Sequence, residues 1–409
     1  MKITAVPARC RRLALVGLLV LACVQSASAG TWKFLVYGDS RGSRITGGVH
    51  TAVLADLAAA TVAEKPDLVL FTGDLAGAGN PATYAAWKSV MQPVYDAGIP
   101  VLPVAGNHEL SGLEAFKSMF LAPLAAHPPQ GIEDLVLDAT DSDGRSYAFR
   151  HRGALFLALD EYADNSVQTH AVNQAFVDVQ LAGRDPAATP LVFAFGHEPA
   201  FRAGRDEGLE QRPAERNAFW RSLEDAGCRA YFCGHMHLYA HARIQPSLWR
   251  LGPVPSAIEQ VISGAAGAPL YDLKYFDDTG SWTVVDLGHD TTHWGYVRVV
   301  VDDATRTVTQ TWVRRVAAGS FQDMPDSMFT YSDASRRWLH LWLGAGLVLA
   351  GAALLIWSWR KLCRCKSRAA ESQPEGSSGG TPGAAGSASV PTSTGEASGT
   401  PPHPEGGQP

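Results

Sequence analysis

The central part of the chain has little cysteine. The sequence of 409 residues contains six cysteines, but residues 30–337 include only Cys228 and Cys233. If the apolar run that begins at Ala230 and ends at Cys233 is a strand, the two Cα atoms lie up to roughly 16 Å apart, at about 3.3 Å per residue. This separation is beyond disulfide reach. The sequence therefore predicts two free, mostly buried thiols rather than a disulfide framework.

An excess of basic residues is also absent. The chain has 34 Lys and Arg residues against 40 Asp and Glu residues and a net charge of −6, and both of its ends are basic, so the middle is acidic. A protein that binds the nucleic-acid backbone needs a basic face, and we expect no such binding here. The apolar fraction of 46% is ordinary for a folded protein and too high for a disordered one.

Acidic residues are missing from residues 1–29. Arginines precede an apolar run at 13–24, and small residues follow at 27–29. This is the layout of a cleaved secretory signal, so we predict that residues 1–29 are a signal peptide and that the rest is exported. An uncleaved anchor is an alternative, although the run is short for a membrane span. A lipid-anchored start at Cys23 is weaker because the bulky Leu21 stands where such sites prefer a small residue.

Residues 338–359 contain no Asp, Glu, Lys or Arg. A helix of these 22 residues would be about 33 Å long, enough to cross a bilayer. Tryptophans near both of its ends and five basic residues directly after it indicate a single transmembrane helix with a cytoplasmic C-terminus. A buried core helix is the alternative, but nothing foldable follows. We thus predict a folded domain at 30–320, a spacer at 321–337, the membrane helix at 338–359, and a basic then low-complexity disordered tail at 360–409.

Short apolar, β-branched runs in the central part predict strands. Helical patterns at 50–63 and 81–97 separate the early runs, which indicates β-α-β units and an α/β fold. The later runs follow one another with turns between them, which indicates antiparallel strands. The early runs are 32–37, 68–72, 101–105, 155–159, 191–195 and 230–233, and the later ones are 282–286, 294–301 and 307–313.

Five of these runs end in a glycine or lead to one, and a polar residue follows it at once. The carboxyl ends of parallel strands meet at one rim of an α/β sheet, so we expect these polar side chains to be neighbours. Each motif alone is more often a turn or a helix cap, but their joint occurrence favours one site. Carboxylate, amide and imidazole groups suit Mn, Fe or Zn. The residues are Asp39, Asp74, Asn107 with His108 and Glu109, His197, and His235 with His237.

In these motifs the sequence resembles the calcineurin-like metallophosphoesterases, in particular their purple-acid-phosphatase-like branch. The family's five motifs occur in order between Asp39 and His237, and stretches at 264–269 and 293–299 also resemble that branch. The resemblance therefore covers about 30–315. It implies a four-layer α/β/β/α sandwich with a two-metal centre between the sheets, and hydrolysis of phosphate monoesters or diesters.

The resemblance also implies a role for each motif residue. Asp74 would bridge two divalent cations, Asp39 and His237 would hold the first, and the other three ligands would hold the second. Two such cations about 3.5–4 Å apart polarise a phosphoryl oxygen and generate hydroxide. The implied ligands are Asp39, Asp74, Asn107, His197, His235 and His237.

His108 carries no metal in the family and would protonate the leaving oxygen, with Glu109 as its orienting partner. The sequence departs from the family at Arg41, where many members have histidine, and at Gly77, where the purple branch has tyrosine. A guanidinium cannot coordinate a cation. The first cation site is therefore weak, filled only with substrate, or replaced by Arg41 binding a phosphate, unless Arg41 is a structural ion-pair residue. No purple chromophore is expected.

These observations predict an exported, membrane-tethered phosphoesterase that acts on a phosphate ester, with His108 and Arg41 as catalytic residues. The alternative is a degenerate phosphoesterase fold that binds a phosphorylated ligand or a metal without turnover. Three further polar residues, Asp160, Arg202 and His241, are expected to be solvated loop residues rather than parts of the site.

Overall fold

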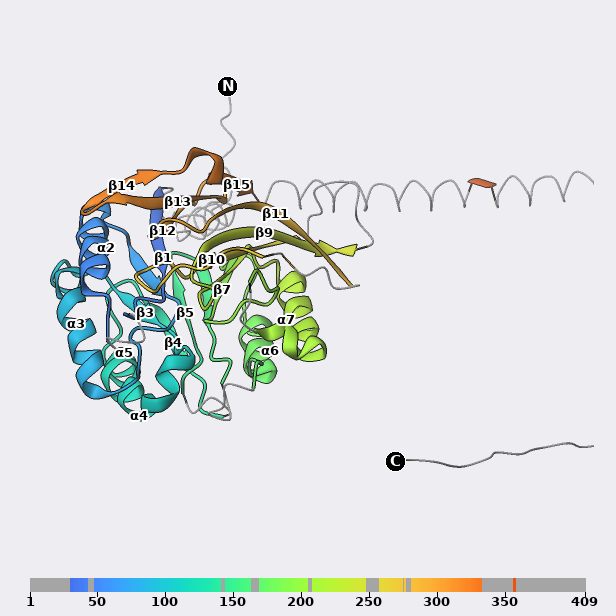
Figure 1. Cartoon of the computed structure of the whole chain (residues 1–409). Coiled ribbons are helices and arrows are strands. Elements are labelled where there is room, and N and C mark those ends of the chain that lie inside the picture. The colour runs from blue at the N-terminus through green and yellow to red at the C-terminus, as the bar shows by residue number, and fades with distance from the viewer. Residues whose placement is uncertain are drawn as a thin grey trace, which may run out of the picture. The chain divides into compact units, whose positions relative to one another are not determined.

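The computed structural model describes most of the central part of the chain. The chain divides into two units, Met1–Trp342 and Leu343–Pro409, and all described residues except 356 and 357 belong to the first (Figure 1). The described residues are 30–42, 48–140, 144–162, 169–204, 208–247, 257–274, 276, 281–332 and 356–357.

The predicted terminal segments fall mainly outside these residues. The predicted signal peptide at 1–29 and tail at 360–409 are not among them, and of the predicted membrane helix at 338–359 only two residues are. Within the described part of the chain, no helix combines the length and the apolar composition that a membrane crossing needs.

Seven strands of the described residues form the first sheet, in the order β14-β13-β12-β1-β2-β3 with β15 also paired to β13. The strands β1, β2 and β3 are parallel, and β12 joins β1 in antiparallel pairing. Their bounds are β1 (Thr31–Tyr37), β2 (Leu68–Phe71), β3 (Val101–Pro103), β12 (Gly295–Asp302), β13 (Thr307–Ala317), β14 (Ser320–Asp323) and β15 (Phe329–Ser332).

Eight described strands form the second sheet, in the order β11-β9-β10-β8-β7-β6-β5-β4. The strands β6, β7, β8 and β10 are parallel, and antiparallel pairs complete both edges. Their bounds are β4 (Glu133–Leu137), β5 (Tyr147–His151), β6 (Ala154–Ala158), β7 (Leu191–Phe195), β8 (Ala230–Cys233), β9 (Tyr239–Pro246), β10 (Ile258–Ser263) and β11 (Trp282–Asp290).

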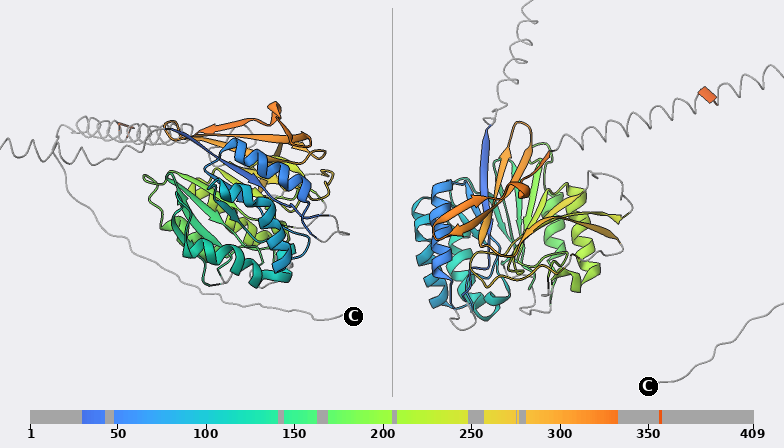
Figure 2. Two further views of the ribbon diagram at one scale, coloured as in Figure 1. Left: turned by 90° about the vertical axis from the view of Figure 1, so that its left-hand side faces the viewer. Right: turned by 45° about the horizontal axis from the view of Figure 1, so that its top comes forward.

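Helices lie beside both sheets (Figure 1 and Figure 2). The N-terminus of α3 shows why the chain turns helical there: Asn80 accepts hydrogen bonds from the N–H groups of Ala82 and Thr83 at 3.0 Å each, and Pro81 occupies the first helical position. The α-helices are α2 (Thr51–Glu64), α3 (Pro81–Asp96), α4 (Leu113–Phe116), α5 (Ala122–Ala126), α6 (Gln174–Ala182) and α7 (Pro213–Ala226), and the shorter turns of helix are Asn107–Gly112, Lys117–Leu121, Leu209–Gln211 and Pro325–Ser327.

Alternation along the central strands sets the order of the layers. On one face of β1, the ring of Phe34 lies 5.3 Å from that of Phe193 and 5.8 Å from that of Phe232, both in the second sheet. On the other face of β1, Tyr37 hydrogen-bonds Thr61 of α2 at 3.0 Å. Tyr231, next to Phe232 in β8, faces away from the first sheet and packs against α7. The mixed α/β fold with two sheets is therefore confirmed, and helices cover both outer faces.

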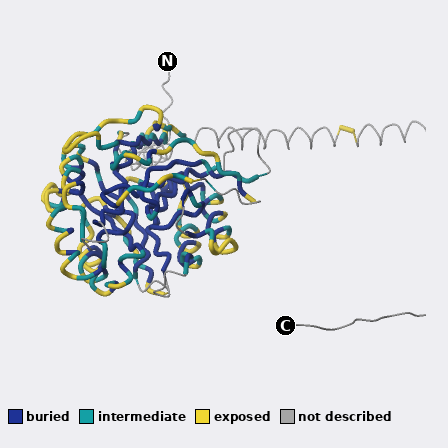
Figure 3. Tube along the Cα trace, viewed as in Figure 1, coloured by how far each residue is buried: buried dark blue, intermediate teal, exposed yellow. Residues whose placement is uncertain are grey.

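Burial follows this layering. Figure 3 shows buried residues concentrated in the strands and exposed residues on the outer helices and turns. Cys228 and Cys233 are both buried and free, as predicted.

The first sheet extends further along the chain than the sequence suggested. Strands β14 and β15 fall almost entirely within residues 321–337, which were predicted as a spacer, and both pair with β13. The sheet therefore continues to Ser332 rather than ending at 320. The long strand β13 explains this, since its 11 residues offer one edge on which two short strands can pair in succession.

Candidate metal centre and active site

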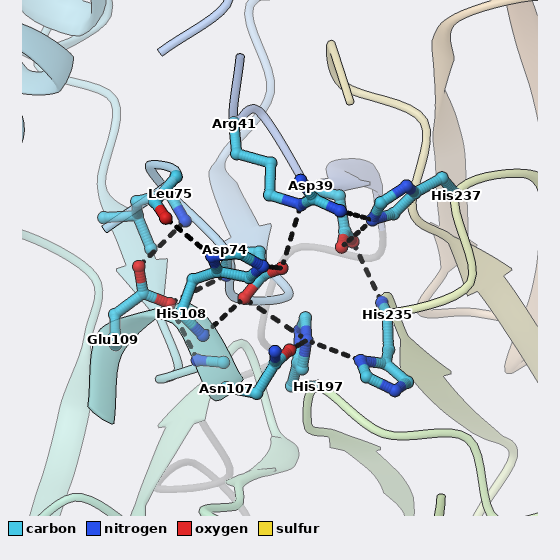
Figure 4. A network of polar contacts seen from close by, with 12 residues as sticks. Asp39, Arg41, Asp74, Leu75, Asn107, His108, Glu109, His197, His235 and His237 are labelled. Atoms are coloured by element: carbon cyan, nitrogen blue, oxygen red, sulfur yellow. Dashed lines mark hydrogen bonds and ion pairs between the residues drawn. The ribbon is translucent and has the colours of Figure 1, made fainter. Parts of the chain in front are cut away.

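The predicted site residues come together where the parallel strands end. Loops leave the carboxyl ends of β1, β2 and β3 in the first sheet and of β7 and β8 in the second, and their polar side chains point toward one another (Figure 4). The eight predicted metal-binding and catalytic residues all belong to this network: Asp39, Arg41, Asp74, Asn107, His108, His197, His235 and His237. The prediction that these residues are neighbours in space is confirmed.

The loops at the site are tightly constrained. Asp39, Asp74 and His235 have left-handed backbone angles, with φ of 61°, 51° and 65°. Such angles are uncommon for residues other than glycine and for histidine require support from the surroundings. A hydrogen bond from the N–H of His235 to Asp39 Oδ2, at 3.0 Å, supplies such support. A Cβ atom at Gly106 would lie 2.4 Å from Asp74 Oδ1, so only glycine fits there.

Four donor atoms converge at one side of the centre. His197 Nε2 lies 3.1 Å from Asn107 Oδ1, 3.2 Å from His235 Nδ1 and 3.5 Å from Asp74 Oδ1. His197 Nδ1 donates to the carbonyl oxygen of Thr72 at 2.7 Å, which leaves the lone pair of Nε2 directed at the other three atoms. Two ring nitrogens and two oxygens that lie this close together fit the ligand set of a divalent cation.

Protonation at this position also suits a cation. Burial lowers the pKa of His197, which favours the uncharged ring that a metal ligand needs. Burial raises the pKa of Asp74, but the neighbouring His197, His108 and His235 outweigh that effect and leave the pKa below its ordinary value. Asp74 is therefore a carboxylate.

On the other side of the centre, Asp39 and His237 face each other, with 3.5 Å between Asp39 Oδ1 and His237 Nε2. Burial, followed by the charge of Arg41, lowers the pKa of His237 to about 3. Arg41 itself lies within this group: its Nη2 is 3.3 Å from His237 Nε2, and its Nε is 3.6 Å from Asp74 Oδ2. The donor set that the family resemblance assigns to the first cation is thus present, but it surrounds a guanidinium.

His108 is positioned by a main-chain carbonyl group. Its Nδ1 donates to the carbonyl oxygen of Gly77 at 2.7 Å, and its Nε2 lies 3.7 Å from Asp74 Oδ2. The side chain is 27% exposed, whereas that of His197 is fully buried, so the ring of His108 can be reached from solvent. The expectation that Glu109 orients His108 is wrong, because both carboxylate oxygens of Glu109 accept main-chain N–H groups instead.

Sequence reasoning missed one carboxylate that supports the site. Glu161 is buried, and its Oε1 accepts hydrogen bonds from the N–H of His197 at 2.9 Å and from Tyr231 at 3.0 Å. An acidic residue shortly after a buried strand was the available signal, since Glu161 lies three residues beyond the end of β6.

Two of the three residues expected in solvated loops are buried. Asp160 forms an ion pair with Arg145 at 3.0 Å, and His241, inside β9, contacts Glu259 at 2.9 Å. Arg202 is half-buried and lies 3.9 Å from Glu210. None of these contacts involves a residue of the metal centre.

Comparison with known proteins agrees with this geometry. The model of the calcineurin-like phosphoesterase family matches residues 32–239. A protein named cAMP/cGMP dual specificity phosphodiesterase, from Mycobacterium tuberculosis, is 26% identical over 184 residues, which are 44% of this chain and 51% of that protein. A protein named probable cyclic nucleotide phosphodiesterase, from Rhodococcus erythropolis, is 34% identical over 175 residues, which are 42% of this chain and 52% of that protein.

The fold is also similar to a solved structure. A purple acid phosphatase from yellow lupin seeds superposes with a TM-score of 0.55 and 16% identity, over 74% of this chain and 54% of that chain. The chain spans about half the length of the curated relatives that it matches. Since the family model covers about half of the 409 residues and includes all eight predicted site residues, the chain belongs to the calcineurin-like phosphoesterase family.

Proposed function

We propose that this protein hydrolyses phosphate esters at a centre that requires divalent cations. The observation that carries the proposal is the convergence of Asp74 Oδ1, Asn107 Oδ1 and His235 Nδ1 within 3.1–3.5 Å of His197 Nε2. A divalent cation bound there would polarise a phosphoryl oxygen and acidify water. Mn, Fe and Zn all suit this set of oxygen and nitrogen ligands.

The residues around the cation supply the rest of the chemistry. His108 holds its ring in place through Nδ1, so its Nε2 is the atom that can carry a proton to the departing oxygen. Without that proton the leaving group would depart as a costly alkoxide. Arg41 presents a fixed positive charge beside Asp74 and binds the phosphoryl group of the substrate.

Phosphodiesters are the first substrate class to test. Both curated relatives are named for cyclic nucleotides. We extend that substrate class to this chain as part of the proposal. An aryl monoester and an aryl diester, compared with a cyclic nucleotide, separate phosphatase from phosphodiesterase activity.

We also propose that the folded domain is exported and tethered by a helix at 338–359, with the C-terminus in the cytoplasm. The support is the signal-like layout of residues 1–29 and the uncharged segment followed by basic residues. A reporter that is active only outside the cytoplasm, fused after residue 30, should be active, and the same reporter at the C-terminus should be inactive. The reverse pattern would contradict this topology.

A second candidate function is binding of a phosphorylated ligand without turnover. The position of Arg41 among the expected ligands of the first cation is the observation that favours it. The two functions separate in one experiment with the full-length chain. We expect chelation to abolish hydrolysis and added Mn, Fe or Zn to restore it, whereas a pure binding protein would show no hydrolysis before or after reconstitution.

A further inference from the structure

Arg41 occupies the space that a first cation would need. Its guanidinium contacts two of the site residues, with Nη2 3.3 Å from His237 Nε2 and Nε 3.6 Å from Asp74 Oδ2 (Figure 4). Asp39 Oδ1 lies 3.5 Å from the same His237 nitrogen. Arg41 is buried, as are Asp39, Asp74 and His237. The group is therefore a closed arrangement rather than a surface ion pair.

The two ring nitrogens of His237 have different partners. Its Nδ1 donates to the carbonyl oxygen of Pro269 at 2.9 Å, so Nε2 carries the lone pair. A lone pair in that direction can meet a cation or an N–H donor, and the donor that it meets is Arg41 Nη2. The ligand atom of His237 is thus already used by the arginine.

A further residue holds the guanidinium in place. The ring of Tyr271 packs against that of His237 at an angle of 31°, with 4.1 Å between the ring centres, and its hydroxyl oxygen accepts from Arg41 Nη2 at 3.5 Å. The N–H of Tyr271 also donates to the carbonyl oxygen of His237 at 2.9 Å, which fixes the position of one residue against the other. Arg41 therefore has contacts on both sides of its guanidinium.

The two oxygens of Asp74 divide the centre into two parts. Oδ1 faces His197 and the other ligands of the proposed cation, and Oδ2 faces Arg41. In a centre with two cations these oxygens would bridge two metals; here one of them already faces a cationic side chain. Arginine cannot lose its proton in a protein, so a second divalent ion would have to bind against a permanent positive charge.

We propose that the centre binds one divalent cation, on Asp74, Asn107, His197 and His235, and that the Arg41 guanidinium takes the place of the other cation. The proposal rests on the proposed function and replaces the expectation of two cations. Arg41 then provides the positive charge that a first metal would provide. It does so through hydrogen bonds to the phosphoryl oxygens rather than through coordination. His237 and Tyr271 act as positioning residues for the arginine.

The test counts the cations bound to the full-length chain. The protein is equilibrated with excess Mn(II), unbound metal is removed, and bound metal is measured by elemental analysis and by electron paramagnetic resonance. We expect one Mn per chain and the signal of an isolated ion. Arg41→His and Arg41→Ala remove the guanidinium and should raise the count to two and produce a spin-coupled pair. Arg41→Lys keeps the charge and should stay at one.

The outcomes separate this proposal from the proposed function. Two Mn ions and a coupled signal in the unmodified chain would overturn it, even if hydrolysis is found. A count that stays at one in both Arg41→His and Arg41→Ala would also overturn it, because the arginine would then not be what excludes the second ion. One bound Mn without any hydrolysis would support the single-cation centre and contradict the proposed function.

Discussion

Glu109 accepts a hydrogen bond from the main-chain N–H of Asp74, with 2.8 Å between Oε2 and the nitrogen. The same carboxylate accepts from the N–H groups of Leu75 at 3.1 Å and of Gly106 at 2.8 Å. Glu109 is fully buried. Burial and the charge of Asp74 raise its pKa well above the ordinary value, although the three N–H groups oppose this shift. One side chain thus joins the loops after β2 and β3, which carry Asp74 and Asn107.

Replacement of Glu109 should therefore weaken the metal centre without removing a ligand. Glu109→Gln puts an NH₂ group where one oxygen accepts main-chain N–H groups, and we expect cation affinity to fall about 10–100-fold. Glu109→Ala leaves three buried N–H groups without their acceptor and should lower the free energy of unfolding by about 3 kcal/mol. Metal titration and denaturant unfolding measure the two effects.

Glu114→Gln is the matched control for this prediction. The Glu114 side chain is 88% exposed, and among the described residues its ion pair is with the nearby Lys117. The cation affinity and the stability of the Glu114→Gln variant should therefore match those of the unmodified chain. Equal cation affinity in Glu109→Gln and Glu114→Gln would mean that Glu109 does not position the loops.

His108→Ala should slow hydrolysis according to the leaving group. An alkoxide needs a proton from Nε2 and should leave about 10²–10⁴-fold more slowly, whereas p-nitrophenolate needs none and should be affected much less. Since His108 is not among the proposed ligands, the amount of bound cation should stay the same. Rates on a series of esters with leaving groups of different basicity, together with metal analysis, test this assignment.

His127→Ala provides the comparison for His108→Ala. His127 is exposed and follows the last residue of α5, where its main-chain N–H donates to the carbonyl oxygen of Pro123. Its replacement should leave the rates on all esters unchanged. A uniform loss of rate in His108→Ala across the whole series would contradict a role in protonating the leaving oxygen.

Glu64 should make stability depend on pH. Its carboxylate accepts from Lys33 at 2.9 Å and from Arg298 at 2.7 Å, and so links α2 to β1 and β12. Partial burial raises the pKa of Glu64, but these hydrogen bonds and charges outweigh it, so the pKa is lower than its ordinary value of 4.5. A lowered pKa in the folded state stabilises the fold above pH 4.5, and this contribution is lost as the pH falls through the folded value.

The comparison of Glu64→Gln with the unmodified chain measures this contribution. At pH 7 the free energy of unfolding of the variant should be about 1 kcal/mol lower than that of the unmodified chain. This difference should shrink as the pH is lowered below about 4.5. Glu133→Gln, at an exposed position in β4, should show no such difference. A difference for Glu64→Gln that is constant from pH 7 to pH 3 would contradict the ion-pair account.

The strand ends and their polar loops could be predicted from sequence because both signals are local. A buried apolar run followed by glycine and a polar residue marks each of the loops that carry Asp39, Asp74 and His197. The rule that parallel strands end at a common rim then brings these residues together. The proximity of these residues could therefore be predicted without knowledge of individual side-chain contacts.

The supporting contacts could not be predicted in the same way. Glu161 and His197 are 36 residues apart, and nothing near either residue indicates the partner. His241 is buried because β9 pairs with β10 on one side and β11 on the other, and such a position in a sheet depends on topology. The contact between Arg41 and His237 joins residues 196 positions apart, so sequence showed that Arg41 departs from the family but not where its guanidinium lies.

The most direct test of the proposed function is hydrolysis of a phosphodiester by the full-length chain and by Asp74→Asn, with bound cations counted in both. Asp74→Asn removes the charge that faces the cation, while Asp96→Asn, on the exposed surface of α3, removes a carboxylate far from the rim. We predict turnover in the unmodified chain and in Asp96→Asn, and loss of both turnover and cation in Asp74→Asn. Equal turnover in all three proteins, or none in the unmodified chain with cation bound, would contradict a metal-dependent phosphoesterase centred on Asp74.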